Sequence, residues 1–115
     1  MVLKSASSLI SSFRARYFPQ AVELFDDSVG TTATEIFGSG NGTTHVVIKN
    51  DHGSQVLYVG WDSTVSSTAS THFIGGDLAA GATLTLTDYA GPIWLEGSGA
   101  STTYRVERRY MPRSA

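Results

Sequence analysis

The chain has 115 residues, a length that suits one domain with a core of moderate size. Its formal net charge is −2, and it contains no cysteine. The lack of cysteine excludes a disulfide framework, a thiolate zinc site and a cysteine nucleophile. No stretch approaches the roughly 18 consecutive apolar residues of a transmembrane helix, and serines interrupt the apolar residues near the N-terminus. We therefore expect no membrane partner and no export signal.

The charged residues are segregated along the chain. Three of the eight bases lie within residues 1–16 and four within residues 105–113, whereas the part between Tyr17 and Tyr104 holds Lys49 alone against nine acids. An acidic body with basic ends indicates association with other proteins.

Residues 1–20 differ from the rest of the chain. Four large side chains recur at the spacing of one face of a short helix: Leu9, Ile10, Phe13 and Tyr17. The many serines weaken this pattern because serine is a poor helix former, so an extended arm fits the segment as well. We expect residues 1–20 to form an N-terminal arm or short helix ahead of a single β domain at 21–115. The arm either contacts another chain or packs against its own domain.

From residue 21 the sequence is a series of short strand signals separated by turn residues. They occupy residues 21–27, 32–38, 44–50, 55–61, 72–76, 80–88, 91–97 and 102–110. The clearest pair is THVVIKN and QVLYVGW, which flank the turn DHGS and predict a β-hairpin. In TLTLT, and again in IWLE, apolar residues alternate with others as in a strand with one buried face. Turn signals about every 8–12 residues predict an all-β antiparallel fold, either a β-sandwich or a small jelly-roll-like barrel.

No group of residues matches a catalytic or metal-binding motif. His45, His52 and His72 lack the spacing of a metal site. The acids flank turns or lie on outward strand positions, whereas a hydrolase pair needs one carboxyl group in an apolar cleft. The glycine-rich GSGNGTT lacks the lysine and the helix of a phosphate-binding loop, and no nucleophile elbow is present. We expect no enzyme activity and no cofactor.

The C-terminal sequence RVERRYMPR interleaves arginine with tyrosine, a combination that suits phosphate contact and base stacking. The acidic body, however, would repel a nucleic-acid backbone, and this argues against nucleic-acid binding. We expect the basic C-terminal sequence to dock on an acidic protein surface instead. Trp61, Trp94 and nearby tyrosines suggest a carbohydrate platform as an alternative. Aromatic residues on strands, however, more often pack in a core or an interface.

Part of the sequence resembles a known group of proteins. The order VVIKN, turn, VLYVGWD, polar loop, LAAGATLTLT, GPIW and TYRVE is similar to small β-rich structural proteins of tailed bacteriophages. The matching positions are turn glycines and alternating apolar residues: Ile48, Asn50, Gly53, Leu57, Tyr58, Val59, Gly60, Leu78, Ala80, Gly81, Leu84, Leu86, Arg105 and Val106. The resemblance implies a β fold and a virion component, such as a capsid decoration (cement) protein. It implies no catalytic residue.

The resemblance and the charge distribution together predict a non-enzymatic capsid decoration protein. It would bind the major capsid protein, or another virion protein, as a homo-oligomer, with a trimer as the first expectation. Its location would be the virion, after synthesis in the host cytoplasm. The residues expected at the capsid or subunit interface are Leu9, Ile10, Phe13, Arg14, Arg16, Trp94, Arg105, Arg108, Arg109 and Arg113. The alternatives are a head–tail or tail accessory protein and a glycan-binding module on a virion.

Overall fold

The computed structural model describes residues 21–66 and 71–111, and this part of the chain forms β-strands and no helix. The strands are β1 (Ala21–Val29), β2 (Thr34–Phe37), β3 (Thr43–Asn50), β4 (Leu57–Gly60), β5 (His72–Leu78), β6 (Thr83–Thr87), β7 (Ile93–Gly97) and β8 (Thr102–Tyr110). Each predicted strand position is therefore confirmed, with its ends shifted by at most a few residues. The predicted arm or helix at residues 1–20 lies outside the described residues, so the boundary between arm and β domain stays a prediction.

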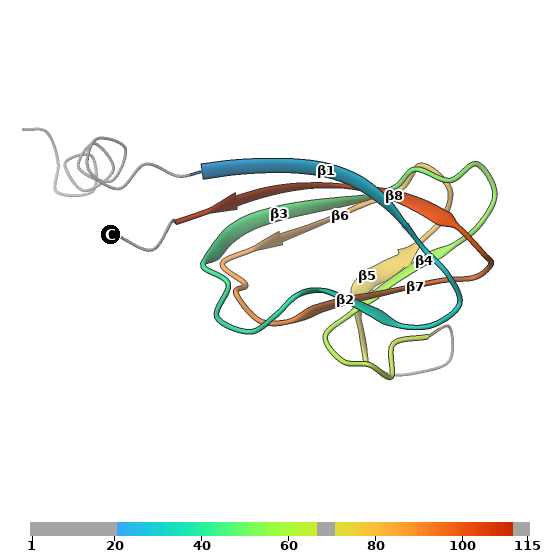
Figure 1. The fold of residues 1–115 in the computed structure, drawn as a ribbon, viewed down its shortest axis with the longest axis horizontal. Coiled ribbons are helices and arrows are strands. Elements are labelled where there is room, and N and C mark those ends of the chain that lie inside the picture. The colour runs from blue at the N-terminus through green and yellow to red at the C-terminus, as the bar shows by residue number, and fades with distance from the viewer. Residues whose placement is uncertain (1–20, 67–70, 112–115) are drawn as a thin grey trace, which may run out of the picture.

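The strands form two antiparallel four-stranded sheets that pack face to face (Figure 1). Sheet A has the order β1-β8-β3-β6, and sheet B has the order β2-β7-β4-β5. The chain changes sheet at nearly every connection, and β4 and β5 are the only consecutive strands that pair with each other among the described ones. This order is that of a jelly roll, in which two Greek keys share two sheets. The predicted all-β antiparallel sandwich is confirmed.

The core lies between the sheets because alternate residues of each strand point inward. In β7, Ile93 and Leu95 are fully buried while Trp94 between them stays half-buried on the outer face. The core side chains are Val29, Phe37, Val46, Ile48, Leu57, Val59, Leu78, Leu84, Ile93, Leu95, Tyr104 and Val106. Each fully buried aliphatic side chain of this kind contributes roughly 1.5–3 kcal/mol to folding.

The predicted hairpin between THVVIKN and QVLYVGW is wrong. β3 pairs with β6 and β8 in sheet A, whereas β4 pairs with β5 and β7 in sheet B. The buried Asn50 ends β3, and its Nδ2 donates to the carbonyl oxygens of Gln55 (2.7 Å) and Leu78 (2.8 Å). Its Oδ1 accepts from the backbone N–H of His52 (3.0 Å). These bonds join the end of β3 to the end of β5 and lead the chain into sheet B.

Aromatic side chains close the two open sides of the sandwich. Between β1 and β2, Phe25 lies edge-on to Phe37 with ring centroids 6.0 Å apart. On the opposite side, Phe73 lies edge-on to Trp61 and to Tyr89, each at 5.2 Å. Such edge-to-face pairs stabilise packing beyond the area that they bury. We call these two sides the β1/β2 side and the β5/β6 side.

No helix among the described residues is long and apolar enough to cross a membrane.

Candidate interaction surfaces

β6 is the edge strand of sheet A on the β5/β6 side, and no described strand pairs with its outer edge. At its end, the backbone N–H of Asp88 donates to the carbonyl oxygen of Thr44 (2.9 Å). In an antiparallel pair the residues that bond to the partner strand alternate, so Leu84 and Leu86 bond to β3. The residues between them therefore turn their N–H and C=O groups outward: Thr83, Thr85 and Thr87.

Nothing within β6 obstructs pairing with another strand. TLTLT holds no charge and no proline, and it pairs with β3 in one regular register. Its three threonine side chains are exposed, and threonine favours the extended conformation. Natural proteins usually protect an edge strand with charges, a proline or a bulge. β6 has none of these devices, so it is open to strand addition.

The other three sheet edges differ from β6. β2 is short, and its pairing with β7 shifts register between Glu35 and Phe37. In β5, residues 73–76 lie opposite Val59 alone, which makes a wide bulge in the edge. β1 is long and acidic, with the carboxylates of Glu23, Asp26 and Asp27. Only β6 among the described edges is regular and uncharged.

The β5 bulge depends on two adjacent glycines. Gly75 has φ of 78°, in the left-handed region that favours glycine. A Cβ atom on Gly76 would lie 2.5 Å from the carbonyl oxygen of Val59, so no larger residue fits without a backbone shift. The bulge turns Ile74 away from both sheets, and its side chain is 100% exposed.

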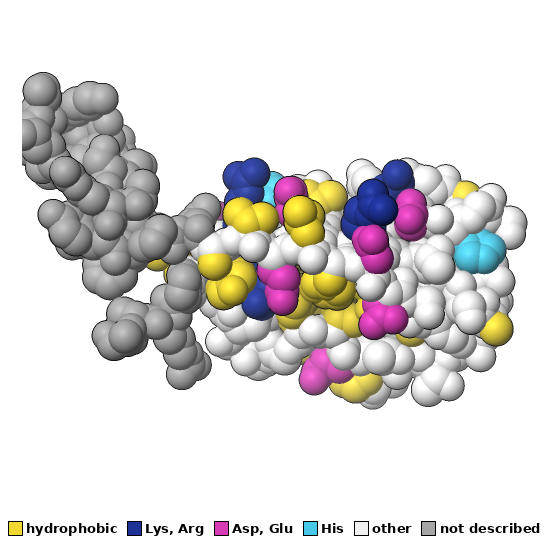
Figure 2. Space-filling model, turned by 45° about the horizontal axis from the view of Figure 1, so that its top comes forward, with side chains coloured by type: hydrophobic (Ala, Val, Ile, Leu, Met, Phe, Trp, Pro, Cys, Tyr) yellow, Lys and Arg dark blue, Asp and Glu magenta, His cyan; other side chains and the backbone are white. Residues whose placement is uncertain are grey.

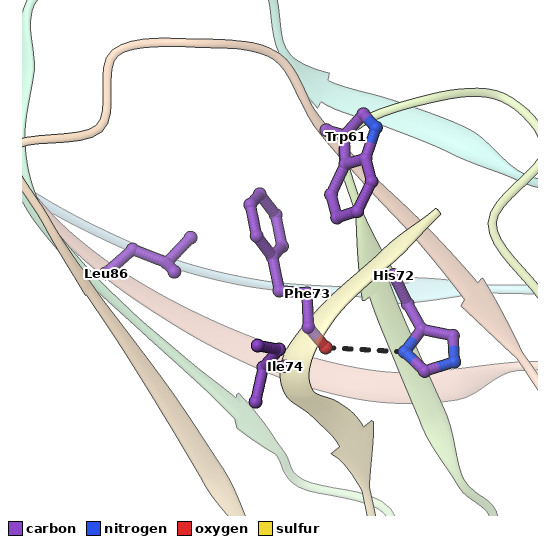
Figure 3. Close-up of a pocket in the computed structure, with 5 residues that line it drawn as sticks. All are labelled: Trp61, His72, Phe73, Ile74 and Leu86. Atoms are coloured by element: carbon purple, nitrogen blue, oxygen red, sulfur yellow. Dashed lines mark hydrogen bonds between the residues drawn. The ribbon is translucent and has the colours of Figure 1, made fainter. Parts of the chain in front are cut away.

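An apolar pocket of about 490 Å³ lies beside Ile74 on the β5/β6 side (Figure 3). Phe73 of β5 and Trp61, which directly follows β4, line one side, and Leu86 faces Phe73 from β6 across the open space. The ring of His72 points away from Leu86, and its Nδ1 donates to the carbonyl oxygen of Phe73 at 3.3 Å. The pocket therefore lies between the outer edges of the two sheets and beside the outward backbone groups of β6.

The outer face of sheet A carries a second set of exposed apolar side chains, visible among charged ones in Figure 2. Val22 and Leu24 of β1 are 58% and 66% exposed. The N–H of Asp51 donates to the carbonyl oxygen of Thr103 (3.0 Å), which fixes the alternation of bonds along β8. By that alternation, Val22 and Leu24 turn their backbone groups toward the unpaired edge of β1. A shallow pocket of about 280 Å³ beside them is lined by Leu24, Phe25, Asp26 and Arg105.

The described strands contain only some of the predicted interface residues. These are Trp94, Arg105, Arg108 and Arg109. Arg105 and Arg109 lie exposed on the outer face of sheet A, and Trp94 lies half-buried on the outer face of sheet B. The others lie outside the described residues: Leu9, Ile10, Phe13, Arg14, Arg16 and Arg113. Their place in an interface stays a prediction.

Arg105 contacts acids of its own chain. Its Nε donates to Oδ1 of Asp26 at 2.8 Å, and its Nη2 lies 3.9 Å from Oδ2 of Asp51. The hydrogen bond to Asp26 and the two carboxylate charges raise the pKa of Arg105. The contacts are solvent-exposed, so they contribute little to stability.

Arg108 occupies the inner side of β8 and closes one end of the sandwich. Its guanidinium carbon lies 4.5 Å from the ring centroid of Phe37 and 4.2 Å from that of Tyr110. Its Nε lies 3.2 Å from Oε1 of Glu23, an ion pair without hydrogen-bond geometry. Only 12% of the Arg108 side chain is exposed. Cation–π contacts of this kind stabilise by about 0.5–2 kcal/mol.

One of the candidate histidines and one of the candidate acids hold turns together. Nδ1 of His52 accepts from the N–H groups of Ser54 (3.1 Å) and Gln55 (2.9 Å). The carboxylate of Asp62 accepts from the backbone N–H of Thr64 (2.9 Å), and this bond lowers the pKa of Asp62. Within residues 21–66 and 71–111, no three His, Cys, Asp or Glu side chains gather as metal ligands.

Sequence reasoning missed the pocket on the β5/β6 side. The prediction treats HFIGG as an ordinary short strand, so it assigns no special place to Phe73 or Ile74. Paired glycines inside a strand signal a bulge or a close approach of backbones. That signal points to the bulge, but the facing position of Leu86 depends on sheet order and cannot be read from local sequence.

No protein-family model matches the sequence. No curated protein matches it either. Among solved structures, the chain is similar to one described by the words "Bacillus endospore appendages form a novel family of disulfide-linked pili". The two are 20% identical, the similarity covers 80% of this chain and 86% of that chain, and the TM-score is 0.49. The similarity assigns no role to any residue.

This comparison corrects the resemblance expected from the sequence. The chain that it finds belongs to a pilus, so the identification as a tailed-phage structural protein is wrong. The predictions that depended on this resemblance are wrong as well. They are the capsid-decoration function, its head–tail and virion-bound alternatives, the capsid partner and the virion location. The physical reason lies in the matched positions. Turn glycines and alternating apolar residues are required by any antiparallel sandwich, so they describe a fold and not its source.

Proposed function

We propose that this chain is a non-enzymatic structural subunit that assembles with copies of itself, head to tail, into an open-ended polymer. The observation that carries the proposal is the regular, uncharged edge β6, whose threonines turn their backbone groups outward. Adding a strand to such an edge satisfies those groups, which gives affinity through main-chain hydrogen bonds. The partner edge is β1 of a second copy.

Strand direction fits this contact. The four strands of sheet A alternate in direction, so β1 and β6, at its two edges, run opposite ways. When β1 of one copy lies beside β6 of the next in the same orientation, the new pair is antiparallel like all the others. The row then has an unused β1 edge at one end and an unused β6 edge at the other, so the contact repeats without closing.

The side chains at the two edges suit each other. On the outer face of sheet A, the exposed threonines of β6 would lie beside Val22 and Leu24 of the neighbouring β1. Pairs of β-branched and aliphatic residues stabilise adjacent antiparallel strands by roughly 0.2–1 kcal/mol each. Pairing two β1 edges would instead bring their carboxylates together, and pairing two β6 edges would leave Val22 and Leu24 uncovered.

The proposed polymer has no disulfide bond within these 115 residues because they contain no cysteine. The pilus to which the fold is similar is described as disulfide-linked, and that linkage has no counterpart here. A pilus is one form that a head-to-tail polymer takes. A closed ring, such as the trimer expected from the sequence, would use the same contact with a larger rotation between copies. Particle size distinguishes the two.

Replacement of Thr85 tests the proposed edge. Thr85→Pro removes an outward N–H that β3 does not use, so the subunit should keep its fold. The proline also blocks the approach of a neighbouring strand, and we expect the concentration required for assembly to rise roughly tenfold or more. Light scattering and electron microscopy measure that concentration and the shape of the particles.

Thr85→Val is the matched control, because valine keeps the N–H group and favours strands. It should assemble as the unchanged chain does. A Thr85→Pro protein that is folded by circular dichroism and assembles like Thr85→Val would overturn the proposal.

A further inference from the structure

We infer that the pocket on the β5/β6 side binds the segment that precedes β1, residues 1–20, of a neighbouring copy. The inference rests on the proposed head-to-tail contact and adds a second binding site to it. The pocket is the one lined by Trp61, His72, Phe73, Ile74 and Leu86.

The pocket offers an apolar surface with no partner among the described residues. Ile74 is 100% exposed and Trp61 is 40% exposed. Both lie on the β5/β6 side, where Leu86 of β6 forms the opposite wall of the pocket (Figure 3). Exposed apolar residues that gather around a pocket mark a binding site more strongly than scattered ones do.

The start of β1 and the end of β6 lie at the same end of sheet A. Ala21 pairs with Tyr110 of β8, and Tyr110 pairs with Thr43 of β3. The next residue, Thr44, accepts the N–H of Asp88, which directly follows β6. When β1 of one copy lies against β6 of another, residue 20 of the first copy therefore enters beside the Leu86 end of the second.

Distance favours the neighbouring copy over the same chain. In the proposed polymer, β1 of one copy lies one strand spacing, about 4.8 Å, from β6 of the next. Within one chain, three such spacings, about 14 Å, separate β1 from β6, and the segment would have to cross the whole outer face of sheet A. Twenty residues reach up to about 66 Å when extended, so the segment is long enough to fill the neighbouring pocket.

The segment is complementary to the pocket in apolarity and in charge. Residues 1–20 contain large apolar residues, including Leu9, Ile10 and Phe13, together with three bases and no acid. The pocket is apolar, and the residues near it along the chain are acidic: Asp62, Asp77 and Asp88. An apolar segment with positive charges suits an apolar pocket on an acidic body.

Cysteine cross-linking of the full chain tests the inference, because the 115 residues contain no cysteine of their own. One preparation carries Phe13→Cys and another carries Ile74→Cys, a change at a fully exposed position that should not disturb folding. The two are mixed, assembled and mildly oxidised. We expect a cross-linked dimer between the two variants on a non-reducing gel. The double variant should give a ladder of dimers and longer species.

Phe13→Cys mixed with Thr32→Cys is the matched control, since Thr32 is exposed in the turn after β1 and lies away from the pocket. It should give at least fivefold less cross-linked dimer. Cross-links found only within single chains of the double variant, or a yield no higher than the control, would overturn the inference. Light scattering of the same samples before oxidation reports the polymer independently. Particles without the Phe13–Ile74 link would refute the inference alone, and absence of particles would refute the proposed function.

Discussion

At the scale of single residues, Asn50 holds the chain where it crosses from one sheet to the other. It is fully buried, and its amide serves three backbone groups of two different segments. A buried polar side chain of this kind is stabilising only while all its partners are present. Asn50 thus holds together the crossing from sheet A to sheet B and the end of β5.

We predict that Asn50→Leu lowers the free energy of unfolding by roughly 2–4 kcal/mol, because leucine leaves buried backbone N–H and C=O groups without partners. Urea unfolding followed by circular dichroism measures the change. Ser54→Ala, in the same loop but exposed, serves as control and should change stability by less than about 0.5 kcal/mol. Equal effects of the two substitutions would show that Asn50 does not hold the crossing.

The arginines near the C-terminus show where sequence reasoning reaches its limit at this scale. Charge counting treats Arg105, Arg108 and Arg109 alike, as groups available to a partner. Arg108 shares its side of β8 with the buried Tyr104 and Val106, and the structure places it between Phe37 and Tyr110. Its aromatic neighbours come from both sheets, so sequence alone could not identify them.

At the scale of elements, the aromatic contacts on the β1/β2 side connect β1, β2 and β8. Phe25 of β1 lies edge-on to Phe37 of β2 and, at 6.4 Å between centroids, to Tyr104 of β8. Tyr104 is buried, and burial, together with the nearby Asp27 carboxylate, raises the pKa of its phenol. The packing of these three strands therefore depends on a neutral Tyr104.

This pKa shift predicts a loss of stability at alkaline pH. The folded chain holds the Tyr104 proton at pH values where the unfolded chain releases it, so the unfolded state binds fewer protons. The free energy of unfolding then falls as pH rises through and beyond about 10. In Tyr104→Phe this decline between about pH 9 and 11 should be shallower, as measured by urea unfolding at each pH. Curves that stay parallel for the two proteins would contradict the prediction.

Element positions were predictable from sequence, whereas element partners were not. Alternation of apolar residues and turn residues identifies every strand within residues 21–66 and 71–111, because those features are local. The hairpin prediction for THVVIKN and QVLYVGW failed because a short polar connection looks alike whether the chain reverses within a sheet or crosses between sheets. The contacts of Asn50 with Leu78, 28 residues away, determine the outcome. The β6 edge and the facing pocket follow from that same non-local order.

At the scale of the whole molecule, the sandwich presents two different sides. The β5/β6 side offers an uncharged edge strand and an apolar pocket, and the β1/β2 side offers a long acidic edge with exposed Val22 and Leu24. In the proposed polymer these two unlike sides contact each other, which gives head-to-tail rows and not a symmetric pair. In that polymer, the inferred contact of residues 1–20 would place the basic segment of one copy near the acidic body of the next.

Amide hydrogen exchange at Thr83, Thr85 and Thr87 tests this account most directly. The N–H groups of these residues point away from β3, so they should exchange quickly in dilute, unassembled protein. They should become protected above the concentration at which particles form, while exposed turn residues such as Thr32 stay unprotected. Particles in which the three threonines exchange as quickly as in dilute protein would contradict the assignment of β6 as the assembling edge.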